Sequence, residues 1–276
     1  MTPTLDLRGG TRIPQLGFGT YKIAPDAAQA AVETALEVGY RHVDTAAMYG
    51  NEAEVGRALA ASGLARDDLF VTSKLNNPFH EPDAARAAFD RSLDDLGLDV
   101  LDLYLIHWPL ARTTDYAATW GVLIEILASG RVRAIGVSNF QPAHLRHVIE
   151  ATGVVPTVNQ VEVHPYLTQE PLRALHADLG IVTGAWSPLA RGRVLDDPVV
   201  RDVARRVGRT ASQVVVRWHL QRGDVVIPKS THRDRMAENA AVFDFTLDDA
   251  AMAALGALNR DQRCGSDPDQ VELDVR

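Results

Sequence analysis

The chain has 276 residues, of which 46% are hydrophobic and 23% charged, and its formal net charge is −8. That length and apolar content suffice for one substantial core, so we expect residues 1–276 to form a single domain. The negative charge argues against a sequence-independent nucleic-acid binder, and no run of eighteen apolar residues is present that would cross a membrane.

The N-terminus and the cysteine content bear on the compartment. The first residues lack the basic start and apolar run of a secretory signal. Cys264 is the only cysteine, so no intrachain disulfide can form. We therefore expect a cytoplasmic protein, and we expect it to be a monomer.

Eight short apolar segments have the pattern of strands that are buried on both faces. They are residues 17–21, 41–45, 69–74, 101–107, 132–138, 157–163, 181–187 and 225–228. Helix patterns with start and stop signals lie between them, for example at residues 27–38, 52–62, 84–96 and 143–151. This alternation predicts a parallel sheet, and eight units predict a closed (β/α)8 TIM barrel.

A doubly wound sheet is the alternative architecture. Its usual first turn is G-x-G-x-x-G, and the corresponding segment here, Gly17-Phe-Gly-Thr-Tyr-Lys22, does not match. Residues 5–13 predict a β-hairpin that turns on Gly9-Gly10 and covers the bottom of the barrel. After strand eight we expect a short extra helix at 233–239, a last helix near 247–258, and an ordered tail or loop over 259–276.

The active site of such a barrel lies at the C-terminal ends of its strands. Asp44 ends the second strand, Lys74 the third and His107 the fourth, and Tyr49 lies in the loop after the second. Because these strands are neighbours, the four side chains can converge. Lys74 is also one of only three lysines, with Lys22 and Lys229, against 25 arginines, and the two cations are not interchangeable at a tight site.

The chemistry of these four residues is complementary. A tyrosine has a pKa near 10, and an adjacent ammonium group lowers it. We expect Tyr49 to act as a proton donor, Lys74 to lower its pKa, Asp44 to keep Lys74 charged, and His107 to bind a substrate oxygen. Each residue alone has an ordinary structural explanation, as a buried ion pair, a packed tyrosine or a core histidine. Their conjunction at adjacent strand ends favours catalysis.

A metal-dependent hydrolase is an alternative, because His42, Asp44, His107 and His164 lie at or near strand ends. However, His42 should lie one layer below Asp44, about 6–7 Å deeper. No His-x-His pair occurs. We therefore expect no metal site.

Six motifs resemble the aldo-keto reductases, in particular the bacterial branch that contains 2,5-diketo-D-gluconate reductases. They are Asp44-Thr-Ala-Ala-Met-Tyr-Gly-Asn-Glu52, Thr72-Ser-Lys74, Leu105-Ile-His-Trp-Pro109, Gly136-Val-Ser-Asn-Phe140, Asn159-Gln-Val-Glu162 and Ile227-Pro-Lys-Ser230. The resemblance implies NADPH-dependent reduction of small carbonyls, dicarbonyls or keto-sugars to alcohols. It places the catalytic set on Tyr49, Lys74, Asp44 and His107, the residues already found at the strand ends.

The resemblance also implies the cofactor contacts. The nicotinamide carboxamide would be bound by Ser138, Asn139 and Gln160, and Trp186 would stack on the ring. Ser187 and Leu189 would lie along the pyrophosphate, with Gly19 and Thr20 also contacting the cofactor. The 2′-phosphate would be bound by Lys229, Ser230, Thr231 and Arg235, and adenine by Glu238 and Asn239. Phosphate sites in barrels often lie after strands seven and eight, at a helix N-terminus, which supports this placement independently.

Two departures from the resemblance affect specificity. His232 stands where close relatives often carry arginine, which allows some use of NADH. The tail segment Arg260-Asp-Gln-Arg-Cys-Gly265 is less glycine-rich than the pattern, so substrate preference does not transfer. We expect Tyr21, Met48, Phe79 and Trp108 to line an apolar substrate pocket. A barrel that binds NADPH as a redox-sensing regulatory subunit stays open as an alternative.

Overall fold

The computed structural model describes residues 2–272, and eight parallel strands form its central sheet. The strands are β3 (Gly17–Gly19), β4 (His42–Asp44), β5 (Phe70–Leu75), β6 (Leu101–Ile106), β7 (Val132–Ser138), β8 (Val158–Glu162), β9 (Val182–Trp186) and β10 (Val225–Val226). They pair in chain order from β3 to β10. The two edges then meet, since Leu16 bridges Val226 in parallel and the Val226 N–H donates to the Gln15 carbonyl at 2.8 Å. The predicted barrel is therefore confirmed.

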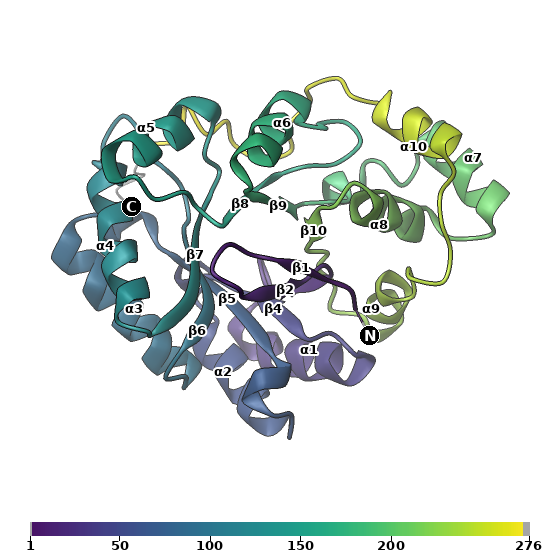
Figure 1. Ribbon diagram of the computed structural model, residues 1–276. Helices are drawn as coiled ribbons and strands as arrows, with labels where there is room; N and C mark the ends of the chain where they lie inside the picture. The colour runs from purple at the N-terminus through teal and green to yellow at the C-terminus, as the bar shows by residue number, and fades with distance from the viewer. Residues whose placement is uncertain (1, 273–276) are drawn as a thin grey trace.

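Ten α-helices accompany the strands within the described residues. They are α1 (Pro25–Val38), α2 (Glu52–Ala61), α3 (Pro82–Leu96), α4 (Tyr116–Ala128), α5 (Pro142–Thr152), α6 (Glu170–Leu179), α7 (Pro198–Val207), α8 (Ala211–Gln221), α9 (Arg233–Ala240) and α10 (Asp249–Gly256). Figure 1 shows most of them arranged around the strands, with α7 and α10 lying side by side at the right.

The predicted short helix after strand eight is present as α9. It packs between α1 and α8, so it also takes the eighth place in the ring of helices. The helices outside that ring are α7 and α10. Helix starts lie about two residues earlier than predicted at α1 and α3, because Pro25 and Pro82 themselves occupy the first helical turn.

The N-terminal hairpin closes one end of the barrel, as predicted. Strands β1 (Thr4–Asp6) and β2 (Arg12–Pro14) pair antiparallel, with Leu5 opposite Ile13. Leu7 and Ile13 are buried and pack against inward-facing residues of the barrel such as Leu103. Figure 1 shows the hairpin lying across the middle of the ring of helices.

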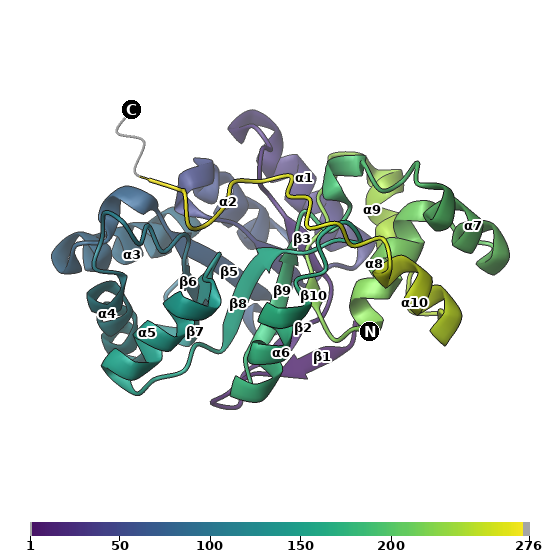
Figure 2. The same ribbon diagram turned by 90° about the horizontal axis from the view of Figure 1, so that it is seen from above.

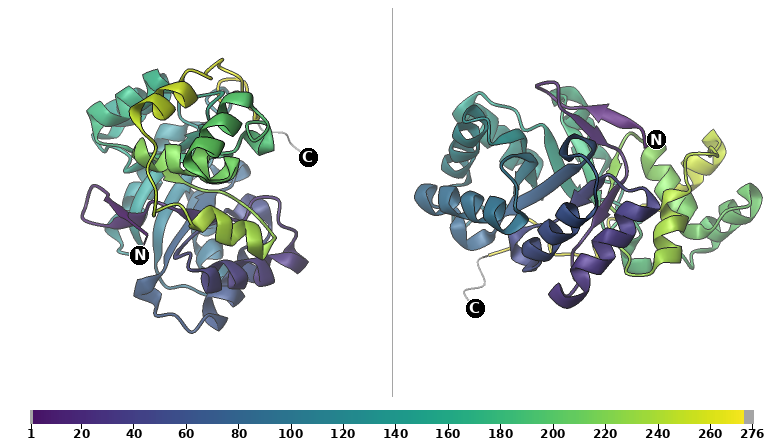
Figure 3. Two further views of the ribbon diagram at one scale, coloured as in Figure 1. Left: turned by 90° about the vertical axis from the view of Figure 1, so that its right-hand side faces the viewer. Right: turned by 90° about the horizontal axis from the view of Figure 1, so that it is seen from below.

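The C-terminal tail lies at the opposite end of the barrel from the hairpin. Figure 2 shows it running from α10 across the strands toward α3, and the left panel of Figure 3 places the tail and the hairpin on opposite sides. The N–H groups of Arg260 and Gln262 fasten its start to the Tyr166 carbonyl. The segment 259–272 is therefore an ordered part of the wall around the strand ends; residues 273–276 of the predicted tail lie outside the described part of the chain. None of the helices in residues 2–272 is long and apolar enough to cross a membrane.

Candidate active site

The four side chains predicted from the strand ends converge. The Lys74 ammonium group donates to Asp44 Oδ1 at 2.6 Å, to the Thr45 carbonyl at 2.8 Å and to the Tyr49 hydroxyl at 3.4 Å. The rings of Tyr49 and His107 meet edge to face, with centroids 5.7 Å apart. One lysine thus joins a carboxylate to a phenol at the C-terminal end of the barrel, opposite the hairpin.

Burial sets the electrostatics of this group. Lys74 is 0% exposed and Asp44 4%. Burial alone would lower the pKa of Lys74, but the Asp44 carboxylate and the Tyr49 phenol outweigh it, so its pKa is raised and the ammonium group keeps its charge. Asp44 therefore has the predicted part of holding Lys74 charged.

The expected lowering of the Tyr49 pKa is wrong. Burial of the phenol is the largest effect and raises its pKa above the usual 10, and the pull of Lys74 in the other direction is smaller. The sequence gives no measure of how deeply the ring is buried, so it could not weigh these two effects. Tyr49 therefore carries its proton throughout the neutral range, which a proton donor requires.

His107 is a neutral imidazole. Burial, and then the charge of Lys74, hold its pKa well below 6.5. Its Nδ1 has no hydrogen-bond partner among residues 2–272, although the ring is only 6% exposed. A buried polar atom without a partner is costly, so this ring is suited to a ligand rather than to the fold alone.

The turn that carries Tyr49 is anchored on both sides. Tyr49 ends a short 3-10 turn, and Gly50 follows with a left-handed φ of 66°. The next residue, Asn51, is fully buried and donates to the carbonyls of Thr20 and Ile23, at 3.1 and 3.0 Å. Glu52 then accepts a hydrogen bond from Ser73, the neighbour of Lys74. The loop is thereby fixed against the segment that follows β3 and against β5, the strand that carries Lys74.

The predicted carboxamide-binding residues lie next to this centre. Gln160 Nε2 donates to the second oxygen of Asp44 at 2.6 Å. Asn139 Nδ2 donates to the His107 carbonyl at 3.0 Å and to Ser138 Oγ at 3.1 Å, while its Oδ1 accepts from the Trp186 indole at 2.9 Å. Amide groups and a half-buried indole therefore lie beside Asp44 and His107, a donor set that fits a nicotinamide carboxamide.

The predicted phosphate-binding segment forms the start of α9. Lys229 and Arg235 are exposed, and neither is paired with a carboxylate within the described chain. His232 caps the helix without a side-chain hydrogen bond, so N–H groups of its first turn are available. Two cations at an open helix N-terminus fit a phosphate group, and the exposed Thr231 hydroxyl lies in the same turn.

Other predicted cofactor residues already have partners in the protein. Glu238 accepts from Thr210 and Asn239 from Ser212, both at the start of α8. Ser230 accepts from the His232 N–H at 3.0 Å. These contacts stiffen the segment around α9.

The residues expected to contact the pyrophosphate and those near the first strand differ in burial and in the contacts they already make. Ser187 has a left-handed φ of 49° directly after β9, and Leu189 is half-buried two residues on. Thr20 is fully buried, and its hydroxyl already contacts Thr45 Oγ1 at 3.0 Å. A Cβ on Gly19 would lie 3.0 Å from Ile227, so this glycine serves close packing of β3 against the segment after β10.

The expected substrate residues lie on the rim of the site. Tyr21 and Met48 are large side chains with 46% and 40% exposure, and the Tyr21 ring lies 5.1 Å from that of Tyr49. Trp108 is half-buried. Phe79 packs against the core beneath the Arg91 guanidinium, so packing accounts for it.

The geometry at the strand ends does not support the alternative of a metal-dependent hydrolase. His42 Nε2 contacts Thr72 Oγ1 at 3.0 Å, one layer below Asp44. Burial lowers the pKa of His42 to about 4, so it is neutral. Among residues 2–272, one group of three metal-ligand side chains lies within reach of one ion, namely Glu162, His164 and Cys264, and it contains none of the four residues predicted to be catalytic.

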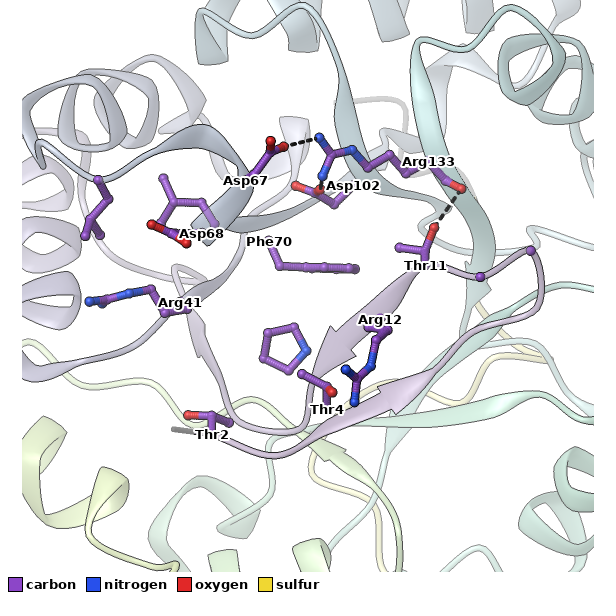
Figure 4. A pocket seen from close by; sticks show the side chains of 15 residues that line it. Thr2, Thr4, Thr11, Arg12, Arg41, Asp67, Asp68, Phe70, Asp102 and Arg133 are labelled. Carbon is purple, nitrogen blue, oxygen red and sulfur yellow. Dashed lines mark hydrogen bonds and ion pairs between the residues drawn. The ribbon is translucent and has the colours of Figure 1, made fainter.

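A groove of about 810 Å³ lies at the other end of the barrel beneath the hairpin. Figure 4 shows Asp67, Asp102 and Arg133 joined there by hydrogen bonds, with Thr11 of the hairpin bound to the Arg133 carbonyl. It is remote from Tyr49, since it lies at the N-terminal ends of the strands. Active sites of (β/α)8 barrels lie at the other end, so size alone does not identify the site.

Sequence reasoning missed the part that Glu162 plays. Its carboxylate accepts hydrogen bonds from His164 and from the N–H groups of Cys264 and Gly265, which holds the tail against β8. A signal was present, because Glu162 lies two residues after Gln160 and so faces the same side of the strand.

Comparisons with known proteins agree with this geometry. Residues 15–260 match the model of the aldo/keto reductase family. A protein named aldo-keto reductase from Mycolicibacterium smegmatis is 48% identical over 268 residues, which is 97% of this chain and 98% of that protein. A protein named methylglyoxal reductase DkgA from Salmonella typhimurium is 46% identical, over 96% of each chain.

Solved structures give the same result. The apo form of Gox0644 superposes with a TM-score of 0.96 at 43% identity, covering 99% of this chain and 100% of that one. A mutant of Gox0644 in complex with NADPH gives a TM-score of 0.95, with the same identity and coverage. The comparisons of sequence and of fold thus agree with each other.

Proposed function

The chain belongs to the aldo/keto reductase family, and from this membership we propose that it uses NADPH to reduce small aldehydes, ketones, dicarbonyls or keto-sugars, with Tyr49 as the proton donor. The observation that carries the proposal is the position of the Lys74 ammonium group, 2.6 Å from Asp44 and 3.4 Å from the Tyr49 hydroxyl. The proposal treats the chain as one catalytic domain, because the eight strands form a single sheet.

The cofactor fits the residues present. Asn139, Gln160 and Trp186 would hold the nicotinamide end, and Lys229 and Arg235 would bind the 2′-phosphate. When bound, NADPH supplies the hydride that reduces the carbonyl carbon. Lys229 and Arg235 are exposed and have no carboxylate partner among residues 2–272, so they give a protein with a net charge of −8 a local positive site for an anionic ligand.

The chain's own residues supply the proton and orient the carbonyl. The substrate oxygen lies beside Tyr49 and His107, where the imidazole N–H donates a hydrogen bond to it. As negative charge grows on that oxygen, the phenol proton passes to it. The charge then rests on the tyrosinate, where Lys74 stabilises it strongly because the ammonium group is fully buried. Asp44 prevents the lysine from giving up its own proton.

The substrate class requires a direct test. Purified protein would be given a panel of short aldehydes, methylglyoxal and keto-sugars, and NADPH consumption would be followed by absorbance. Dicarbonyls come first, because a relative 46% identical bears the name methylglyoxal reductase. We expect turnover with at least one class. If NADPH binds but no carbonyl is turned over, the redox-sensing alternative is favoured instead.

A further inference from the structure

A second group of ionisable side chains lies where the tail crosses the end of β8. Glu162 ends that strand, His164 follows it, and Cys264 comes from the tail. One carboxylate oxygen, one ring nitrogen and the sulfur all lie within 4.8 Å of one another. Glu162 and His164 are 1% and 0% exposed, whereas Cys264 is partly exposed and so gives access from solvent.

The carboxylate at the centre of this group is charged. Burial alone would raise the pKa of Glu162, but hydrogen bonds from His164 and from the N–H groups of Cys264 and Gly265 lower it. The catalytic mechanism uses none of these side chains. A buried anion therefore lies beside an imidazole and a thiol, with no role yet assigned to the three together.

We propose that Glu162, His164 and Cys264 bind a thiophilic divalent cation of the Zn²⁺ class, and that the bound cation fixes the tail to β8. Zinc takes oxygen, nitrogen and sulfur ligands, and in a tetrahedral site these atoms lie roughly 3.5 Å apart. The Glu162 and His164 atoms are already 3.0 Å apart, so it is the sulfur that must move closer, by up to about 1 Å, which rotation of the Cys264 side chain on the tail can supply. A fourth position is left for water.

The charges and protons of this site balance. Burial and the nearby Glu162 raise the pKa of the Cys264 thiol, so without a cation it is protonated and donates to the Ala190 carbonyl at 3.5 Å. On binding, the S–H proton leaves to solvent and a metal–sulfur bond forms. The ring proton of His164 moves to Nδ1, which lacks a partner among residues 2–272, and Nε2 becomes a ligand. Two anions and one dication then sum to zero.

A fixed tail affects the catalytic centre through Trp186. The backbone of Gly265 lies so close to the indole that a Cβ there would be 2.4 Å from the ring. The indole in turn donates to Asn139, one of the expected carboxamide ligands. A cation that holds residue 264 therefore restrains Trp186, and we expect it to slow turnover. This effect on turnover rests on the proposed function, whereas binding of the cation does not.

The test uses the full chain after treatment with a chelator. Titration with Cd²⁺ should produce the ultraviolet absorption of a cadmium–thiolate bond, saturating at one equivalent. Because the chain has a single cysteine, that signal reports this site alone. Zn²⁺ should displace Cd²⁺, and its affinity should rise with pH because one proton is released.

Three variants localise the site. Cys264→Ala should abolish the absorption, and Glu162→Gln should weaken Zn²⁺ binding, measured by calorimetry, by at least about tenfold. His147→Gln removes an exposed imidazole from α5 and should change neither measurement. Cys264 lies on the tail and is partly exposed, so its variant should fold even if the buried Glu162→Gln does not.

Two results would overturn the site. One is the lack of any thiolate signal at stoichiometric Cd²⁺ and micromolar protein. The other is Zn²⁺ binding that Cys264→Ala leaves unchanged, which would place the cation elsewhere. If binding is confirmed but Zn²⁺ slows the wild type and Cys264→Ala equally, the effect on turnover is wrong. These binding measurements stand even if no carbonyl substrate is found.

Discussion

The two ends of the barrel place different residues in left-handed backbone conformations. At the N-terminal end, the turns that lead from helices back into strands use glycine. They include Gly39, Gly63, Gly97, Gly130, Gly153, Gly180 and Gly223, with φ between 64° and 115°. At the C-terminal end, the turns that leave strands use mainly residues with side chains, although Gly50 and Gly192 also have positive φ there. The residues with side chains include Lys22, Leu110, Asn139, Ser187, Ala190 and Arg191, with φ between 47° and 64°.

This difference has an energetic meaning. Glycine adopts a positive φ without steric cost, whereas a residue with a Cβ pays on the order of 1 kcal/mol or more. The hairpin end is therefore built for stability. The other end carries strained residues such as Asn139 and Ser187, which the resemblance assigns to the cofactor.

Each end also contains a buried carboxylate paired with a cation. At the hairpin end, Asp102 accepts from Arg66 at 2.7 Å, from Arg133 at 3.1 Å and from the Val71 N–H at 2.8 Å. At the catalytic end, Asp44 accepts from Lys74 and Gln160. The arginines that pair with Asp102 are partly exposed, whereas the lysine that pairs with Asp44 also contacts the Tyr49 hydroxyl. A buried ion pair alone is thus not evidence of catalysis; a transferable proton beside it is.

The largest expected effect comes from Tyr49→Phe. Loss of the phenol proton should lower kcat by about 10²–10⁴-fold, the usual contribution of a positioned acid, while NADPH binding measured by fluorescence titration stays close to that of the wild type. The matched control is Tyr104→Phe, which removes a buried phenol hydroxyl on the outward face of β6. Turnover in that variant should be unchanged.

The protonation of Tyr49 also predicts how turnover depends on pH. Reduction requires the protonated phenol, and burial raises the pKa of Tyr49 above 10. Turnover of the wild type should therefore show no loss from this group as the pH rises through neutrality, and should fall only at strongly alkaline pH. Near-normal turnover of Tyr49→Phe at pH 7 would remove this residue from the mechanism.

Exchanging the type of cation at each end sharpens the comparison. Lys74→Arg places a larger, planar group in a site that is 0% exposed, and a displacement of about 1 Å can cost roughly 100-fold in rate. Arg133→Lys, at 40% exposure of its side chain, should leave kcat within about twofold and cost about 1 kcal/mol or less in unfolding free energy. Steady-state kinetics and denaturant titration measure the two. Equal kinetic losses would contradict the assignment of separate roles.

The 2′-phosphate assignment predicts a smaller effect. Arg235 is exposed at the start of α9 and has no carboxylate partner in residues 2–272. Arg235→Leu should weaken NADPH binding by about 10–100-fold, the range of one charge-assisted hydrogen bond, and NADH binding much less. The ratio of the two dissociation constants is the measurement. Equal losses for both cofactors would show that the arginine does not contact the phosphate.

The sequence predicted the parts of the molecule that repeat or that end a strand. The alternation of strands and helices predicted the barrel, and the strand ends predicted Asp44, Lys74 and His107. Helices α4, α6, α7 and α8 received no predicted bounds; in α4, the apolar residues show little periodic contrast with polar ones. The contact of the tail with Glu162 spans about a hundred residues, and no local pattern specifies which carboxylate meets which backbone N–H.

The direction of the Tyr49 pKa shift was also beyond the sequence, for a related reason. Chain order can place an ammonium group beside a phenol, but burial depends on how all eight strand ends and their loops pack together. In this form of the protein burial is the larger effect, and it reverses the expected sign.

The smallest expected effects test the turns at the hairpin end. Gly97 follows α3 with φ 64°, and a Cβ there would meet no atom within 4 Å. Gly97→Ala should therefore lower the free energy of unfolding by about 1 kcal/mol through backbone strain alone. Gly121, inside α4, has equally open surroundings and lacks a positive φ, so Gly121→Ala should raise stability by about 0.5–1 kcal/mol.

Both substitutions add one methyl group in open space. If denaturant titration shows changes of opposite sign in the free energy of unfolding, the backbone conformation is the cause. Turnover should be unchanged in both variants, since neither residue lies near the C-terminal ends of the strands. A loss of similar size in the two would mean that the added methyl group itself is harmful. The contrast between glycine turns at one end and strained residues at the other would then lack its energetic basis.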